Sequence, residues 1–366
     1  MPIDFIPQME PNFGAEEKAE INRCLDEGSW LTEFKRTSLF EGQLASWTGA
    51  KHCIVVNNGT VSLILAALAV GLKPGDEVIV PNYTMIATPN SVKMIGCVPK
   101  FVDVERDTLC MDITEAQKAI TSRTKALILV TANGRYPKAG IAAFELLCAE
   151  NRIELIEDAA QSLGSFYPDG RHMGTAGVVG TFSFSSPKVI STGQGGAIIT
   201  NSDEVAERAH KLKDFGRTTC GSDVHDSIGY NFKFTELQAC VGLAQMRKLA
   251  WRVERKKTIY RLYRQQLLCR QVEFFEQDLN WTTPWFIDVL TEDRNGLANF
   301  LKSQGIGTRP MYPPINKQLA YGIAGEYPTS NLVGQKGLWL PSASHLTDEQ
   351  ISMICERIFS YYIQKP

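Results

Sequence analysis

The first 200 residues alternate short apolar runs with segments of helical periodicity. The runs have strand length, are rich in β-branched residues, and are separated by helical sequence. They occupy residues 53–56, 77–80, 98–102, 125–131, 153–157, 180–185 and 197–200. Near-continuous apolar strands that alternate with helices indicate an α/β fold, in which helices cover both faces of a mainly parallel sheet.

Helical periodicity is clearest over residues 15–28, 60–70, 87–95 and 204–215. Gly28 is the last residue of the first segment and Gly71 follows the second, and glycine is common where a helix ends. A basic helix is expected over residues 236–268. Its cations between Arg252 and Arg264, including Lys256, alternate with apolar residues, and we expect them to form a solvated face.

The composition changes after this basic helix. Residues 281–290, 296–304 and 347–362 have the pattern of a smaller α+β unit. A chain of 366 residues is long enough for two cores. We therefore expect a large α/β domain over residues 1–250 and a small C-terminal α+β domain over residues 251–366.

Charge and cysteine content exclude several classes of protein. The net charge of −2 provides no basic field for nucleic acid or an anionic membrane. The nine cysteines have irregular spacing and no CxxC pair, which indicates reduced, mostly buried thiols and no zinc site. No apolar run reaches membrane-spanning length, and residues 1–11 lack the pattern of a secretion signal. We expect a soluble, cytoplasmic protein without a metal site.

Polar or glycine-rich sequence follows several predicted strands, where parallel α/β sheets bind their ligands. The turn from Asn57 to Thr60 enters a helix, and its backbone amides suit a phosphate group. A simple turn with Thr60 as the helix cap is the alternative. Asp158, at another strand end, has the charge to hold a protonated ring nitrogen, or it caps the next helix.

Lys188 is the most informative of these residues. It follows Phe182 and Phe184, which alternate with Ser183 and Ser185, and a glycine-rich segment comes next. Lysine forms a Schiff base with aldehydes, and burial lowers its pKa toward reactivity. A surface lysine in a loop is the alternative. A fourth polar segment contains Asn231 between aromatic residues, which is typical of a contact or of a plain loop.

In this order, these segments resemble the DegT/StrS family of nucleotide-sugar aminotransferases over nearly the whole chain. The resemblance includes the segments at 28–32, 213–217 and 305–310. It implies the fold of type I enzymes that depend on pyridoxal 5′-phosphate (PLP), with pyridoxamine 5′-phosphate as the intermediate carrier. It also implies a homodimer with a shared active site and L-glutamate as the amino donor.

The resemblance also implies the role of each cofactor-binding residue. Lys188 would carry the cofactor and shuttle the proton, and Asp158 would pair with its ring nitrogen. Gln161 would approach the ring hydroxyl. Gly59, Thr60 and Ser183 would bind the phosphate of the cofactor. Asn231 would reach the same phosphate from the partner subunit.

Two departures from the family pattern concern the cofactor's surroundings. Met85 stands where many members have an aromatic residue that stacks on the ring, and Tyr83 is a second candidate for that contact. The loop Asn133-Gly134-Arg135 also differs, and we expect it to alter sugar contacts or the electrostatics near the phosphate.

Residues 309–310, together with residues 193–196 and 226–231, resemble members that act at C4 of the sugar. GDP-4-keto-6-deoxymannose is the favoured substrate, with UDP-4-keto-6-deoxyglucose as the competitor. The resemblance places Arg309, Tyr312 and Trp30 near the substrate, although Trp30 also suits a core and Arg309 a surface ion pair. It further implies a role in making deoxyamino sugars for polysaccharides such as an O-antigen.

Three other classes of function compete with this hypothesis. A PLP-dependent dehydratase or an inactive regulatory relative shares the family pattern, but the dehydratases replace the lysine with histidine, and Lys188 is present. A nicotinamide-dependent oxidoreductase needs a GxGxxG turn, which residues 57–60 do not supply. A sugar-binding protein would have neither cofactor nor turnover.

Overall fold

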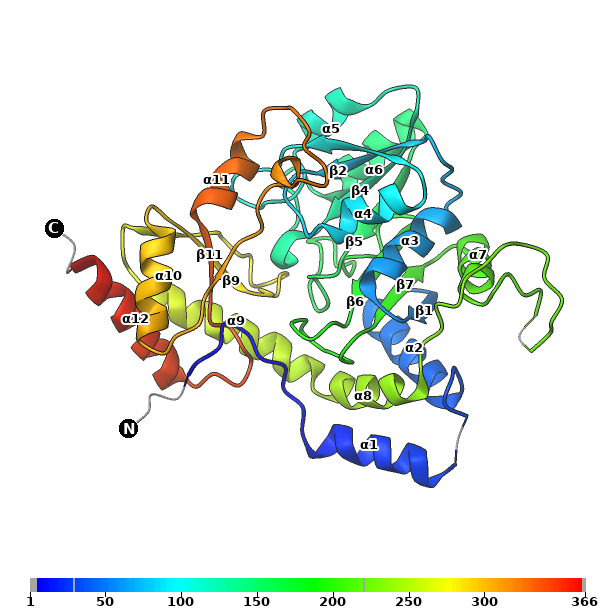
Figure 1. Ribbon diagram of the computed structural model, residues 1–366, viewed down its shortest axis with the longest axis horizontal. Helices are drawn as coiled ribbons and strands as arrows, with labels where there is room; N and C mark the ends of the chain where they lie inside the picture. The colour runs from blue at the N-terminus through cyan, green and yellow to red at the C-terminus, as the bar shows by residue number, and fades with distance from the viewer. Residues whose placement is uncertain (1–4, 29, 220, 364–366) are drawn as a thin grey trace.

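A computed structural model describes residues 5–28, 30–219 and 221–363 (Figure 1). Its larger sheet has seven strands in the order β1-β7-β6-β5-β4-β2-β3. These strands are β1 (His52–Val56), β2 (Glu77–Pro81), β3 (Val98–Val102), β4 (Thr124–Val130), β5 (Glu154–Asp158), β6 (Val179–Ser183) and β7 (Gly196–Thr200). Every strand expected in the first 200 residues is therefore present, with ends displaced by one or two residues.

Most neighbouring strands of this sheet are parallel, as predicted. β7 is the exception, because it runs antiparallel to both β6 and β1. The chain returns from β6 to β7 through residues 184–195 without a crossover helix, and such a return gives antiparallel strands. This loop contains Lys188.

Helices cover both faces of the seven-stranded sheet. Alternate residues of β4 face opposite cores, so Ile128 packs with one helical layer and Leu127 with the other. The first layer includes α3 (Gly59–Ala69), α4 (Ala87–Met94) and α7 (Asp203–Lys213), and the second includes α5 (Ile113–Ala119) and α6 (Ile141–Asn151). The α/β architecture is confirmed.

A second, four-stranded sheet has the order β10-β11-β9-β8, and all of its pairs are antiparallel. Its strands are β8 (Val272–Phe274), β9 (Ile287–Thr291), β10 (Arg309–Pro310) and β11 (Gly337–Leu340). The helices α10 (Arg294–Ser303), α11 (Pro328–Lys336) and α12 (Asp348–Ile363) lie beside it (Figure 1). Ile6, near the start of the chain, pairs with Ile306 in this part. The domain boundary near Ala250 stays a prediction.

The expected basic helix is two helices, α8 (Glu236–Arg247) and α9 (Leu249–Gln266). The prediction of a solvated basic face is wrong for two of its cations. Arg252 and Lys256 are each only 2% exposed, because they donate to backbone carbonyls of segments that cross α9. Arg252 donates to Val189 and Asn12, and Lys256 donates to Trp285 and Ser342.

The remaining helices are α1 (Ala15–Asp26), which was expected, and α2 (Lys35–Thr48), which was not. Every cysteine in the described residues is a free thiol, and all of these are buried except the half-buried Cys269. Cys220 and Ser29 lie outside the described residues. Across the described ranges, no helix combines the length and the apolar character needed to cross a membrane.

Candidate active site

A cavity of about 290 Å³ lies at the carboxyl ends of β5 and β6. Seven predicted site residues line it, namely Gly59, Thr60, Met85, Asp158, Gln161, Ser183 and Lys188. Asn58, Leu63, Ala87, Ala160, Ser185 and Gln194 complete the lining. The structure therefore brings together segments that lie more than 100 residues apart in the chain.

The amino end of α3 forms one wall of this cavity. Asn58 caps the helix, and its side chain accepts from the Val61 amide at 2.9 Å. Within the described part of the chain, no acceptor is recorded for the amides of Gly59 and Thr60. Two free amides at the positive end of a helix dipole form an anion site.

Gly59 is required by the close approach of β6. A Cβ atom at this position would lie 2.6 Å from the Cβ of Ser183. The half-buried Ser183 and Ser185 line the cavity, while Phe182 and Phe184 are buried on the opposite side, as their alternation predicted. The Ser183 hydroxyl thereby lies beside the two free amides of α3.

Asp158 ends β5 and is buried against α4. Its Oδ2 accepts from the Thr88 hydroxyl at 2.7 Å, and its Oδ1 accepts from the Ala160 amide at 3.2 Å. Burial raises the pKa of the carboxyl, while both hydrogen bonds and the charge of Lys188 oppose that shift. The two donors fix the carboxylate toward the cavity, where a cationic partner would complete its environment.

Gln161 is held by Asn133, which belongs to the loop that departs from the family pattern. The Asn133 amide donates to Gln161 Oε1 at 2.7 Å, which leaves the side-chain NH2 of Gln161 to donate elsewhere. Asn133 adopts a left-handed conformation (φ 54°). Its side chain accepts from the Phe286 amide at 2.6 Å and donates to the Phe286 carbonyl at 2.9 Å.

Lys188 is half-buried, and its amine lies against the face of Trp285. The Nζ atom is 4.1 Å from the centre of the indole ring. Burial lowers the pKa of Lys188 to about 8; the carboxylate of Asp158 opposes this shift and the charge of Arg309 adds to it. An amine with this pKa is partly neutral near pH 8, which makes it a nucleophile and a proton acceptor.

A buried ion pair anchors the loop that contains Arg135. The Arg135 guanidinium is buried and forms a two-point ion pair with Asp288, at 2.7 and 3.1 Å. Its Nε donates to the carbonyl of Thr108. The charge is neutralised inside the protein, and Arg135 lies two residues from Asn133 but does not itself line the cavity.

Among the described residues, those lining the cavity do not include Asn231, Trp30, Arg309 or Tyr312. Arg309 is exposed and lies over the rings of Trp339 (5.4 Å) and Tyr312 (5.9 Å). Its charge acts on Lys188, so it lies beside the site. Trp30 is 71% exposed, which rules out a core position in this chain.

Of the two candidates for a contact with the cofactor ring, Met85 lines the cavity and Tyr83 does not. Met85 is 43% exposed and lines the cavity, as expected. Tyr83 is buried beside Tyr312 and Arg135, at the small void behind Gln161. Met85 is therefore the residue of this pair that is available to contact a ring in the cavity.

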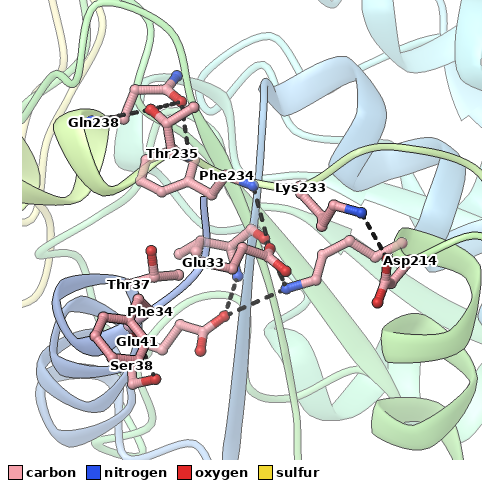
Figure 2. A network of polar contacts seen from close by, with 12 residues as sticks. Glu33, Phe34, Thr37, Ser38, Glu41, Asp214, Lys233, Phe234, Thr235 and Gln238 are labelled. Carbon is pink, nitrogen blue, oxygen red and sulfur yellow. Dashed lines mark hydrogen bonds and ion pairs between the residues drawn. The ribbon is translucent and has the colours of Figure 1, made fainter. Parts of the chain in front are cut away.

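A polar network holds Lys233 and Phe234, in the segment that follows Asn231 (Figure 2). Lys233 donates to Asp214 at 2.7 Å, and the Phe234 amide donates to Glu33 at 3.2 Å. The buried ammonium of Lys213 pairs with Glu33 at 2.8 Å and with Glu41 at 3.8 Å. Asn231 itself is exposed at the end of this network.

The model of the DegT/DnrJ/EryC1/StrS aminotransferase family matches residues 11–359. The chain belongs to this family. A relative from Escherichia coli O157:H7 named GDP-perosamine synthase is 35% identical, over 99% of this chain and 100% of that protein. One from Vibrio cholerae with the same name is 33% identical, over 98% and 99%. DesV from S. venezuelae, solved in complex with a ketimine intermediate, has a TM-score of 0.90 at 30% identity, covering 96% and 95%.

The protein is thus a PLP-dependent sugar aminotransferase, and its cavity fits that cofactor. The amides of Gly59 and Thr60 and the hydroxyl of Ser183 would form a phosphate cradle, a space that a Cβ at Gly59 would fill. The same cavity contains a carboxylate, Asp158, for a ring nitrogen and a primary amine, Lys188, for the aldehyde.

Proposed function

We propose that the protein transfers the amino group of L-glutamate to C4 of GDP-4-keto-6-deoxymannose and so forms GDP-perosamine. The observation that carries this proposal is the end-to-end similarity, at 35% and 33% identity, to two proteins named GDP-perosamine synthase. A cavity that combines a lysine, a buried carboxylate and an anion site supports the chemistry.

Six residues of the cavity have a defined task in this reaction. When bound, the cofactor supplies an electron-withdrawing ring that stabilises negative charge on the substrate carbon. Asp158 holds the proton on the ring nitrogen, and Gln161 donates to the ring hydroxyl. The amine of Lys188 accepts the proton from the Cα atom of glutamate and later delivers a proton to the sugar. Gly59, Thr60 and Ser183 bind the phosphate.

The proposal includes a homodimer in which Asn231 of the partner subunit completes the phosphate site. Two observations support this arrangement. Asn231 is exposed and does not line the cavity of its own chain, and the neighbouring Ile228 is 85% exposed. We place Trp30, Arg309 and Tyr312 on the sugar side of the site, where Arg309 supplies the positive charge for a diphosphate.

The test is incubation with nitrogen-15-labelled glutamate and a panel of GDP- and UDP-linked 4-keto-6-deoxyhexoses, followed by mass spectrometry. We expect labelled amino sugar in the GDP series, release of 2-oxoglutarate, and neither product with Lys188→Ala. Turnover confined to the UDP series would reassign the nucleotide. Turnover of 3-keto sugars alone would overturn the proposal, and sugar conversion without 2-oxoglutarate would indicate a dehydratase.

A further inference from the structure

Trp285 contacts the catalytic lysine at two points. Its ring lies under the Lys188 amine, 4.1 Å from Nζ to the ring centre. Its indole N–H donates to the carbonyl of Pro187 at 2.7 Å, in the residue just before the lysine. The side chain of Trp285 therefore fixes both the backbone that carries Lys188 and the place where its amine rests.

The indole ring has little freedom to move. Trp285 is 2% exposed and stacks on Phe286 with a centre-to-centre distance of 3.8 Å. Trp339 packs edge-on against it at 6.0 Å, and the buried Lys256 holds its carbonyl at 2.8 Å. A buried aromatic ring with packed neighbours and a bonded N–H presents a fixed surface to the lysine.

We propose that Trp285 is a positioning residue that receives the Lys188 amine whenever the amine is not covalently linked, and that its face stabilises the protonated form. This proposal rests on the proposed role of Lys188 as a proton carrier. An aromatic face attracts an ammonium ion without accepting a conventional hydrogen bond. The N–H groups of the ammonium thus stay available to the substrate carbon, which a carboxylate partner would not allow.

Other ionisable groups near the Lys188 amine also influence its protonation. Asp158, on β5, favours the protonated amine, and Arg309, on β10, opposes it. The pKa of the Tyr312 phenol is raised to about 12 by burial, so this group is neutral near pH 8. Lys256 donates to the backbone carbonyl of Trp285 and not to its ring. The indole face is uncharged and fixed in position, and it adds a further attraction for the protonated amine of Lys188.

The test measures the pKa of Lys188 in the cofactor-free protein. Competitive labelling with acetic anhydride over a range of pH, read out by peptide mass spectrometry, gives the neutral fraction of this one amine. We expect Trp285→Leu to lower the pKa by about one unit, equivalent to about 1.4 kcal/mol of lost cation–π stabilisation. Trp285→Phe is expected to cause a smaller decrease, because a benzene ring attracts a cation less strongly.

Phe286→Leu is the matched control, because it removes a ring of the same aromatic stack and leaves the indole face in place. We expect it to leave the pKa of Lys188 unchanged. An equal shift in Phe286→Leu and Trp285→Leu would overturn the proposal. If Trp285→Leu does not fold, unchanged labelling curves in both Trp285→Tyr and Trp285→Phe would overturn it. The measurement uses neither sugar nor glutamate, so its outcome is independent of the substrate assignment.

Discussion

Burial shifts the two ionisable groups of the cavity toward their neutral forms. It lowers the pKa of Lys188 to about 8 and raises the pKa of Asp158. The hydrogen bond from Thr88 and the charge of Lys188 return Asp158 toward its charged form. A cationic ring placed beside Asp158 acts in the same direction, so cofactor binding favours the carboxylate that holds it.

The pKa of Lys188 predicts how cofactor uptake depends on pH. Only the neutral amine attacks an aldehyde, and a pKa lowered to about 8 means that the neutral fraction rises as the pH passes through 8. The rate at which cofactor-free protein recombines with PLP should therefore rise about eightfold from pH 6.5 to 7.5 and level off above pH 9. Stopped-flow absorbance measures this rate. A rise centred near pH 10.5 would show an unperturbed lysine.

At Gly59, a single added methyl group should damage the phosphate cradle. In Gly59→Ala the new Cβ would lie 2.6 Å from Ser183 Cβ and 3.3 Å from its Cα, so β6 and α3 must separate. We expect a loss of about 1–3 kcal/mol in unfolding free energy and weaker PLP binding. Gly42→Ala, whose Cβ would meet nothing within 4 Å, should not destabilise the protein. Urea unfolding and PLP titration measure both effects, and equal behaviour of the two variants would contradict the prediction.

At the scale of elements, two ion pairs join the first 200 residues to the small sheet and differ in burial. Arg135 and Asp288, on β9, are almost fully buried, whereas Arg106 and Glu273, on β8, are exposed. The buried pair also anchors the loop whose Asn133 amide holds Gln161. Damage to this pair should therefore reach the active site, while damage to the exposed pair should not.

We expect Asp288→Asn to lower the unfolding free energy by about 3–5 kcal/mol, because it leaves the Arg135 charge buried without its counter-ion. Glu273→Gln is the matched control, and it should cost less than about 1 kcal/mol, since both partners are solvated. Equilibrium urea unfolding of the cofactor-free protein measures both values. Similar losses in the two variants would show that burial does not decide the strength of these contacts.

The strands of the large sheet could be predicted from the sequence because most are short, mainly apolar runs, such as residues 126–130 on β4. Helix α2 was missed because its buried residues include Arg36 and Thr37, whose backbone amides donate to the carboxylate of Glu236 about 200 residues later. Lys256 was misplaced for a related reason. The carbonyls that it binds, from Trp285 and Ser342, come from distant segments that no local periodicity reveals.

At the scale of the whole molecule, the cavity residues that follow strand ends were predictable, because parallel strands end at one edge of a sheet. Lys188 and Asp158 belong to this group. Asn133 and Trp285 could not be predicted, since their roles depend on contacts with Gln161 and Lys188 that only the folded chain creates. The glycine after Asn133 was the one local sign of an unusual backbone at that position.

The proposed sharing of the site between two subunits makes a quantitative prediction for mixed dimers. Lys188→Ala and Asn231→Ala should each be nearly inactive alone. In an equal mixture that exchanges subunits at random, half of the dimers are hybrids. In each hybrid one of the two sites has both native residues, so activity should return to about one quarter of the wild-type value. Assays after co-refolding measure this value, and no recovery would show that Asn231 serves its own chain.

The position of β7 between β1 and β6 has a consequence for synthesis on the ribosome. His52 on β1 is paired with Thr200 on β7, and a Cβ at Gly196 would press against the backbone of Asn58 in the phosphate cradle. A nascent chain that ends before Gly196 therefore has neither the partner of β1 nor one wall of the cradle. The ability to bind the vitamin-derived cofactor should therefore arise late in translation, once β7 has been synthesised and has paired with β1.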